Sequence, residues 1–331
     1  MSVRLDHQSG KADEPSAVAG GVLPVTPATV TPPVAAPQRR AGWRDYLVLT
    51  KPKVIVLLLL TTVGAMFIAA GGFPGWIPLL GILLGGYMSA GAAGAFNMVY
   101  DADIDERMKR TRGRPTVTHV VSARDALIFA AALTVLSFVV IALSTNLVAA
   151  FLSWAGIAFY VLIYTMWLKR STWQNIVIGG AAGAIPPLVG WAGATGELSL
   201  MAWLLFGVVF MWTPVHFWAL ALMIKDEYAK VGVPMAPAVI GERATVMQMV
   251  MYTALTILLT VLPFLLREFS LAYFLAILGL NLLLALRVAR LFQLVRAGEP
   301  VDRRAALPLY KYSMSYLGLL FLCMALDRAL F

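Results

Sequence analysis

The sequence predicts an all-α integral membrane protein, and three observations support that fold class. Of the 331 residues, 60% are hydrophobic and only 13% are charged, whereas about a quarter of the residues in a soluble domain are charged. The apolar residues gather in stretches of about 20, the length at which a helix crosses a bilayer. Lys and Arg are concentrated in every second connection between these stretches.

Nine segments are long and apolar enough to span a membrane. In chain order they are 54–72, 76–98, 123–143, 147–167, 173–193, 200–223, 245–266, 269–291 and 309–330. Of the 26 Lys and Arg residues, 24 fall on the side of the N-terminus, and only Arg267 and Arg328 fall on the other side. By the positive-inside rule the N-terminus is cytoplasmic and the C-terminus lies outside.

The net charge of +9 follows from the same distribution. A basic cytoplasmic face beside anionic lipid explains it, so no nucleic-acid partner is expected. The partner implied by the composition is the lipid bilayer, and the expected location is a cell membrane, with the bacterial inner membrane as the specific expectation.

The first 42 residues differ in kind from the rest. Six prolines interrupt this stretch of small residues, which has neither a helical nor a strand period. The composition predicts a disordered cytoplasmic tail over 1–42, and the nine-helix domain occupies 43–331. The tail lacks the apolar core and cleavage site of a secretory signal, so no processing is expected. The one cysteine, Cys323, excludes an intrachain disulfide and a cysteine-based metal site.

Three polar residues at the end of the second span are spaced four apart: Asn97, Asp101 and Asp105. On an α-helix this spacing turns each residue only about 40° from the last and raises it about 6 Å, so the three share one stripe. Acids at the end of a membrane helix are costly unless they hold a positive charge. Oxygen ligands there suit Mg²⁺, which completes its shell with water and substrate phosphates. The stripe therefore predicts a metal–diphosphate site; the alternative is a solvated helix end whose acids pair with nearby basic residues.

The basic residues directly after this stripe fit the same interpretation. Arg110 and Arg114 carry guanidinium groups that bind phosphate oxygens through two parallel hydrogen bonds. Their other possible role is to anchor the loop on the cytoplasmic side. As a group beside two acids, they indicate a ligand with negative charge.

A second acidic segment, Lys225-Asp226-Glu227-Tyr228, follows the sixth span. Asp226 is expected at the same membrane depth as Asp101 and Asp105, which makes it a candidate fourth metal ligand. Glu227 lies about 100° round the helix from Asp226, so only one of the two is expected to face the metal.

Within the bilayer the sixth span contains His216, together with Pro214 and the aromatic residues Trp212 and Trp218. Proline frees a backbone carbonyl, and histidine adds a titratable group at membrane depth. A single histidine in an apolar helix is most often a hydrogen-bonded structural residue; the alternatives are contact with a polar acceptor substrate or ligation of iron. His119, in the first basic loop, has the same ambiguity. The glycines of the fifth span, between Asn175 and Trp191, indicate close helix packing.

These motifs resemble a known family. The acidic stripe followed by Arg110-Thr111-x-x-Arg114-Pro115 is similar to the first aspartate-rich motif of the UbiA superfamily of intramembrane prenyltransferases, and further motifs resemble its protoheme IX farnesyltransferase (heme O synthase) subgroup. Those motifs are Leu49-Thr50-Lys51-Pro52-Lys53-Val54, Asp103-Ile104-Asp105-x-x-Met108-Lys109-Arg110-Thr111, Leu168-Lys169-Arg170-x-Thr172-x-x-Asn175-Ile176, Gly179-Gly180-x-x-Gly183-x-x-Pro186-Pro187 and Trp212-Thr213-Pro214-x-His216-Phe217-Trp218. The resemblance covers about residues 44–330.

Two departures from the subgroup stand out. Position 215 is Val where the subgroup usually has a second proline, and the segment Asp226-Glu227-Tyr228 has one more residue than the subgroup's Asp-Tyr pair.

The resemblance implies nine helices around a central cavity under a cytoplasmic cap, with Mg²⁺ as cofactor and with farnesyl diphosphate and heme B as substrates. The reaction it implies transfers farnesyl to a vinyl group of heme B, with addition of water, to give heme O. Asn97, Asp101, Asp105 and Asp226 would then bind the metal and act in catalysis. Heme would contact residues among His216, His119, Trp212 and Trp218, and a heme A synthase or a terminal oxidase is a possible partner. The candidates to bind the diphosphate are Lys51, Lys53, Arg110, Arg114, Lys169 and Arg170.

Two other functions are compatible with parts of the pattern. A UbiA-type enzyme with an aromatic or quinone-precursor acceptor would share the acidic stripe. A cation transporter could also place acids at a membrane mouth, but it would more often carry them at mid-membrane depth and have charge on both faces. The nearly uncharged outer face argues against transport.

Overall fold

Every regular element in residues 39–331, the part of the chain that the computed structural model describes, is a helix. Nine of the helical spans in this part are long and apolar enough to cross a membrane, which confirms the predicted all-α membrane fold. The predicted tail, 1–42, lies almost wholly outside the described residues.

The spans agree with the predicted segments to within four residues at each end, except that α13 ends five residues later and α14 begins six residues earlier than predicted. They are α2 (Pro52–Ala70), α3 (Trp76–Tyr100), α5 (Ala123–Ser144), the continuous run α6 (Leu147–Ala158), η1 (Phe159–Leu168) and α7 (Lys169–Ser171), then α8 (Asn175–Thr195), α9 (Leu200–Met223), α12 (Gly241–Leu265), α13 (Leu271–Arg296) and α14 (Arg303–Leu330). Four short helices complete the set: α1 (Trp43–Leu49), α4 (Ala102–Arg107), α10 (Lys225–Lys230) and α11 (Ala236–Val239).

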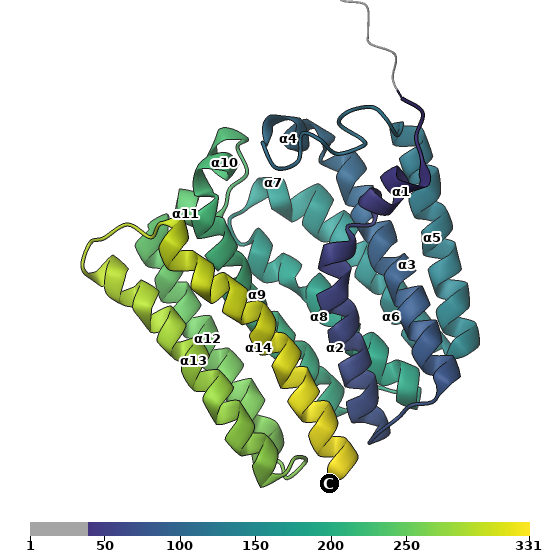
Figure 1. Ribbon diagram of the computed structural model, residues 1–331, viewed down its shortest axis with the longest axis vertical. Coiled ribbons are helices and arrows are strands. Elements are labelled where there is room, and N and C mark those ends of the chain that lie inside the picture. The colour runs from purple at the N-terminus through teal and green to yellow at the C-terminus, as the bar shows by residue number, and fades with distance from the viewer. Residues whose placement is uncertain (1–38) are drawn as a thin grey trace, which may run out of the picture. The chain divides into compact units, whose positions relative to one another are not determined.

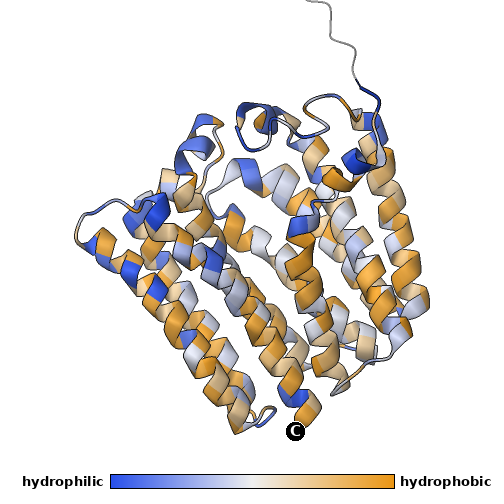
Figure 2. Ribbon diagram, in the orientation of Figure 1, coloured by the Kyte–Doolittle hydropathy of each residue, from blue (hydrophilic) through white to orange (hydrophobic). Residues whose placement is uncertain are grey.

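The short helices α1, α4, α7, α10 and α11 gather at one end of the bundle, which is the upper end in Figure 1. Hydrophilic residues are concentrated at this end, whereas the long helices are largely hydrophobic along their length (Figure 2). The connections at the opposite end are short. The polar chemistry of the described residues therefore lies mainly at the end that carries the short helices.

Helices α8 and α9 form the interior of the bundle. In their most apolar windows 61% and 56% of the residues are buried, against 22% for both α5 and the α6–α7 run. The glycines of α8 explain the close packing: an added methyl group at Gly190 would lie 1.9 Å from the backbone oxygen of Thr62 in α2, and one at Gly180 would lie 2.9 Å from the side chain of Thr213 in α9. The predicted packing role of these glycines is confirmed.

Polar side chains define where several spans begin. At these positions an oxygen accepts a hydrogen bond from a backbone N–H of the first turn, which no carbonyl of the helix can satisfy. The capping residues are Ser122 for α5, Asn146 for α6, Ser199 for α9, Ser270 for α13 and Asp302 for α14.

The junction between α1 and α2 is a sharp bend at Lys51. This residue has a φ of 56° and a ψ of 57°, a left-handed conformation that is uncommon for a residue other than glycine. Pro52 then begins α2 at the first helical position, where a missing N–H costs nothing. The bend packs on Gly94 of α3, where an added methyl group would lie 3.2 Å from the backbone oxygens of Leu49 and Thr50. A glycine in α3 thus lets the bend carry Lys51 to the polar end of α3.

The fourth span contains a feature that the sequence did not predict. Residues Phe159–Leu168 form a π-helix, η1, with a wider turn than the α-helix on either side. Short π-helical segments within α-helices are rare and occur frequently at functional sites. Here the π-helix lies at the polar end of the span, just before Lys169.

Candidate active site at the polar end of the bundle

The three residues of the predicted stripe lie where α3 ends and α4 begins. Asn97 is in the last turn of α3, Asp101 lies between the two helices, and Asp105 is in α4. Asp101 is fully buried and Asp105 is 3% exposed. The alternative of a solvated helix end is therefore wrong, because both carboxylates are enclosed by protein.

Asn97 connects three elements of the site. Its Nδ2 donates to Asp101 Oδ2 at 2.7 Å and to Thr165 Oγ1 of η1 at 3.0 Å. Its Oδ1 accepts from Lys51 Nζ. The amide thus fixes the position of one carboxylate and one lysine at the same time.

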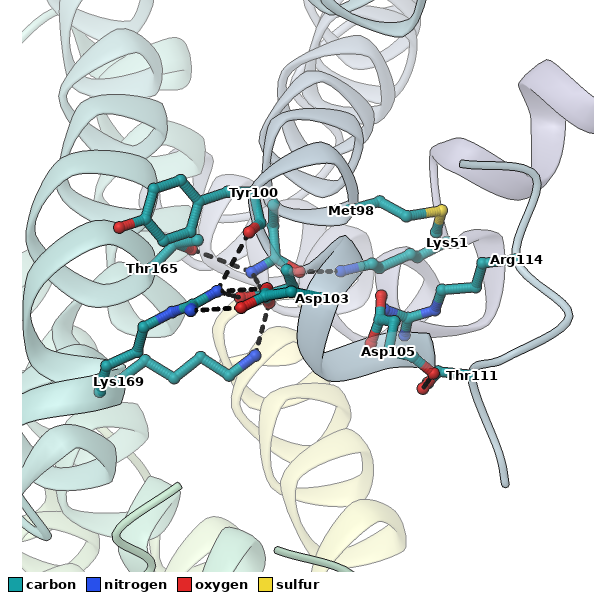
Figure 3. A network of polar contacts seen from close by, with 12 residues as sticks. Lys51, Met98, Tyr100, Asp103, Asp105, Thr111, Arg114, Thr165 and Lys169 are labelled. Atoms are coloured by element: carbon teal, nitrogen blue, oxygen red, sulfur yellow. Dashed lines mark hydrogen bonds and ion pairs between the residues drawn. The ribbon is translucent and has the colours of Figure 1, made fainter. Parts of the chain in front are cut away.

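Each buried carboxylate is paired with a basic residue from elsewhere in the sequence (Figure 3). Lys169 Nζ lies 2.5 Å from Asp101 Oδ2, and Arg114 Nη1 donates to Asp105 Oδ2. Arg170 binds Asp103 through two hydrogen bonds of 2.8 Å, and its Nη2 also lies 3.8 Å from Asp101 Oδ1. Pairing of this kind offsets the cost of burying charge in a largely apolar protein.

The electrostatics of the cluster favour an anionic ligand. Lys51, Arg114, Lys169 and Arg170 together outnumber the three acids they surround. Burial, with the positive charge of Arg114 next, lowers the pKa of Lys51 to about 7. An anion bound beside Lys51 would favour its charged form.

One fully buried carboxylate oxygen of the cluster has no hydrogen-bond partner among the described residues. Asp101 Oδ1 is buried and accepts no hydrogen bond, although a buried carboxylate oxygen almost always has one. A carboxylate oxygen without a hydrogen bond, in a cluster with a second carboxylate and an amide, fits a Mg²⁺ site. Mg²⁺ takes oxygen ligands and completes its shell with substrate phosphates. Among the described residues no three Asp, Glu, His or Cys side chains come together at metal-binding spacing, so the protein alone does not enclose an ion.

The structure does not bring every predicted residue to this cluster. Lys53, two residues beyond Lys51 on α2, is exposed, and so is Arg110 in the loop after α4. Neither has a hydrogen bond or an ion pair to a described residue. Asp226 on α10 is exposed and is not gathered with the two buried acids. The four-residue metal cage is therefore incomplete in this structure, because α10 presents Asp226 to solvent.

Sequence reasoning missed a pair of tyrosines beside the carboxylates. The rings of Tyr160 and Tyr164 of η1 have centroids 5.3 Å apart and planes inclined at 32°, and both lie within electrostatic range of Asp101 and of Tyr228 on α10. Gly179 of α8 makes room for them, since an added methyl group would lie 2.3 Å from the ring of Tyr164. The sequence does contain a run of aromatic residues at the end of the fourth span. Assuming a regular α-helix there gives the wrong direction for these side chains, because the segment is a π-helix.

The loop after α10 and residues of α4 line one small cavity. The cavity has a volume of about 140 Å³, and its lining includes Asp103, Arg107, Arg170 and the loop 231–233. Asn175, at the start of α8, donates to the backbone oxygen of Pro234 at 3.2 Å and so ties the same loop to the bundle. The loop that follows the second acidic segment thus reaches the cluster, whereas Asp226 itself is exposed.

His216 forms a second polar centre, deeper in the bundle between α9 and α14. It is 8% exposed and is sandwiched between Trp212, at 4.6 Å between ring centroids, and Tyr310, at 4.9 Å. Its Nδ1 lies 2.7 Å from Ser313 Oγ.

The other two acceptor candidates do not join His216. Trp218 is fully buried and packs edge-on against Tyr252 of α12, since two residues along a helix turn it about 200° away from His216. His119 is exposed in the loop before α5 and has a φ of 56°. Of the four candidates, only Trp212 and His216 therefore lie together.

Comparison with known proteins agrees with this architecture. The model of the UbiA prenyltransferase family matches residues 57–313. Proteins named protoheme IX farnesyltransferase are similar to the chain: one from Thermus thermophilus is 61% identical over 289 residues, and one from Deinococcus radiodurans is 54% identical over 300 residues. The chain covers 46% of the Thermus relative, less than half its length, but 96% of the Deinococcus one. These alignments include 87% and 88% of the chain, respectively.

Solved structures share the fold at low sequence identity. A digeranylgeranylglyceryl phosphate synthase superimposes with a TM-score of 0.71 at 18% identity, over 86% of this chain and 98% of that one. A UbiA homolog from Archaeoglobus fulgidus bound to DMAPP and Mg²⁺ superimposes with a TM-score of 0.63 at 18% identity, over 85% of this chain and 99% of that one. At this identity the likeness establishes the fold and nothing finer.

Proposed function

The chain belongs to the UbiA prenyltransferase family, and we propose that it transfers a farnesyl group from farnesyl diphosphate to a vinyl group of heme B, giving heme O and diphosphate. The observation that carries the proposal is the cluster at the polar end of the bundle, where buried carboxylates, an unfilled carboxylate oxygen and an excess of basic residues occur together. The choice of farnesyl and heme as substrates rests on the relatives that are more than half identical to the chain.

Asn97, Asp101 and Asp105 are the proposed Mg²⁺ ligands. When bound, Mg²⁺ would act as a Lewis acid on the diphosphate oxygens and so stabilise the leaving group. Asp226 is the proposed fourth ligand, contributed by α10 when the substrate is bound. The loop after α10 lines the same small cavity as Asp103 and Arg170, which supports this role.

Lys51, Arg114, Lys169 and Arg170 are proposed to bind the diphosphate. As the bond between the farnesyl carbon and oxygen breaks, negative charge builds on the diphosphate, and basic groups already fixed beside it stabilise that charge. Lys53 and Arg110 are left out of this set because both are exposed and unpaired with the cluster.

The allylic cation formed in this step has to reach the vinyl group before water does. The farnesyl carbon then bonds to one vinyl carbon, water adds to the other vinyl carbon, and a proton is lost. The adjacent rings of Tyr160 and Tyr164, in the π-helix whose Thr165 contacts Asn97, are proposed to stabilise the cation through their faces and to exclude water. Trp212 and His216 are the proposed contacts to heme.

Incubation of the purified protein in lipid nanodiscs with heme B, farnesyl diphosphate and Mg²⁺ tests the proposal. We expect mass analysis of the extracted heme to show the addition of one farnesyl group and one hydroxyl group, and addition of a chelator to stop the reaction. A parallel incubation with an aromatic acid in place of heme tests the alternative acceptor. Prenylation of the aromatic acid, with heme left unchanged, would contradict the proposal.

The chain is a multi-pass membrane protein, and we propose that the polar end of the bundle faces the cytoplasm of a bacterial cell. In a Cys323→Ser background, Gly113→Cys and Ala229→Cys should react with an impermeant thiol reagent only from the cytoplasmic side, and Thr195→Cys only from the other side. If positions 113 and 229 react from opposite sides, the two acidic segments cannot act on one diphosphate. A heme A synthase or a terminal oxidase in the same membrane is the proposed recipient of the product.

A further inference from the structure

Ser313 of α14 makes two contacts that together define the chemistry of His216. Its Oγ donates to the backbone oxygen of Tyr310, one turn earlier in the helix, at 2.8 Å, and lies 2.7 Å from His216 Nδ1. Its backbone oxygen also accepts a hydrogen bond from Trp212 Nε1 at 2.9 Å. The side chain of Ser313 is fully buried. Two side chains of α9 are thus held by one residue of α14.

The number of protons in this chain of contacts determines the tautomer of His216. A serine hydroxyl has one hydrogen, and a backbone carbonyl can only accept. Because the oxygen of Tyr310 can only accept, we assign the Ser313 hydrogen to that contact, and His216 Nδ1 is then the donor to Ser313 Oγ. In a neutral imidazole Nε2 then has a free lone pair. No described residue forms a hydrogen bond with that Nε2.

The ring of His216 is also fixed in orientation. Trp212 stacks on one side with an interplanar angle of 14°, Tyr310 stacks on it with an angle of 22°, and Phe217 meets it edge-on at 5.4 Å. A histidine that ligates a metal usually donates its other ring N–H to a fixed acceptor, which sets both the tautomer and the direction of the free nitrogen. The surroundings of His216 have each of these features.

We infer that Ser313 is a positioning residue that holds His216 as the Nδ1–H tautomer, so that Nε2 can ligate the iron of a metalloporphyrin. The inference rests on the proposed function in that the metalloporphyrin is the heme acceptor. It goes further by assigning the contact to the iron rather than to the porphyrin edge, and by naming a residue outside the sequence motifs. Removal of the Ser313 hydroxyl would leave Nδ1 without its acceptor and would no longer favour the ligating tautomer.

The test compares binding of ferric heme with binding of metal-free protoporphyrin IX to the full-length protein in nanodiscs. For Ser313→Ala we expect roughly tenfold weaker binding of heme and a changed Soret band, the effect typical of losing the partner of a metal-ligating histidine. Binding of metal-free protoporphyrin should change by less than about twofold. Ser137→Ala is the matched control, because Ser137 is also fully buried and donates to the carbonyl one turn earlier, Thr134, at 2.8 Å, but lies in α5 without a histidine contact.

Two further variants separate positioning from packing. Ser313→Thr keeps the hydroxyl and should bind heme with the Soret band of the unaltered protein. In a His216→Ala background, Ser313→Ala should have no additional effect on heme binding, because the residue acts through the imidazole. Equal weakening of heme and metal-free porphyrin, or an unchanged effect in the His216→Ala background, would overturn the inference while leaving the proposed function intact. Failure of the unaltered protein to bind heme at all would overturn both.

Discussion

The two acidic segments of the chain reach the same end of the bundle in different states. At the junction of α3 and α4, Asp101 and Asp105 are buried, and each is paired with a basic side chain. On α10, Asp226 is exposed and has no ion pair or hydrogen bond to a described residue. The first segment is thus assembled by the fold itself, whereas the second needs a further event to act on the same ligand.

The two acidic segments differ in burial because they follow different parts of the fold. Asp101 and Asp105 continue from α3, whose last turn packs against α2 and η1, so their surroundings are fixed by three elements of the membrane domain. The α10 helix has only six residues and leaves the membrane domain after Met223. Lys225 in that helix is paired with Glu242 at the start of α12, so the ion pair that the structure shows for α10 is to α12 and not to the carboxylates. Preorganisation is therefore expected in the first segment and movement in the second.

The largest expected effect is loss of either buried carboxylate. Asp101→Asn or Asp105→Asn should lower farnesyl transfer to heme by about 100-fold or more, the scale observed when a main electrostatic stabiliser is removed. Each change also leaves a basic partner unpaired, so the thermal unfolding temperature should fall. Near-normal turnover by a well-folded variant, or activity that persists in a chelator, would contradict the proposed metal site.

Substitution of the exposed acid Asp226 should lower turnover less, and it should not lower the unfolding temperature. Asp226→Asn should lower turnover by roughly 10- to 100-fold if α10 brings this residue to the metal in the loaded enzyme, but the unfolding temperature should stay the same because the side chain is solvated. Glu227→Gln, one residue along the same helix, is the matched control and should change turnover by less than about twofold. Similar losses from both variants would indicate a general effect of negative charge in this segment rather than ligation by Asp226.

The spans and the acidic stripe could be predicted from the sequence because each depends on a short-range pattern. Apolar length fixes the spans, and a spacing of four placed Asn97, Asp101 and Asp105 together even though the helix breaks at Asp101. The partners of these residues could not be deduced in the same way. Lys169 reaches Asp101 across 68 positions of the chain, and its approach depends on a π-helix that no α-helical period indicates.

The sequence also did not show which basic residues would be exposed. Lys51 and Lys53 are two positions apart in one motif, yet only Lys51 contacts the site. The deciding feature is the left-handed bend at Lys51, which packs on a glycine of another helix, Gly94. Similarly, Ser313 is an ordinary small residue of the last span until α14 is placed beside His216. Contacts between distant helices, rather than local pattern, assign these roles.

The smallest expected effects separate the basic residues inside the cluster from those outside it. Lys51→Ala and Arg114→Ala should each raise the KM for farnesyl diphosphate by about tenfold, because each removes a charged hydrogen-bond donor from the place where the diphosphate is proposed to bind. Lys53→Ala and Arg110→Ala, their exposed neighbours, should change KM by less than about twofold, since charges separated from the ligand by water contribute little. Steady-state kinetics at saturating heme measure both pairs. Substitution of the exposed residues could instead raise KM as much as substitution of the clustered ones. Binding would then depend on the total charge of this face, and the arrangement around Asp101 and Asp105 would not be the diphosphate site.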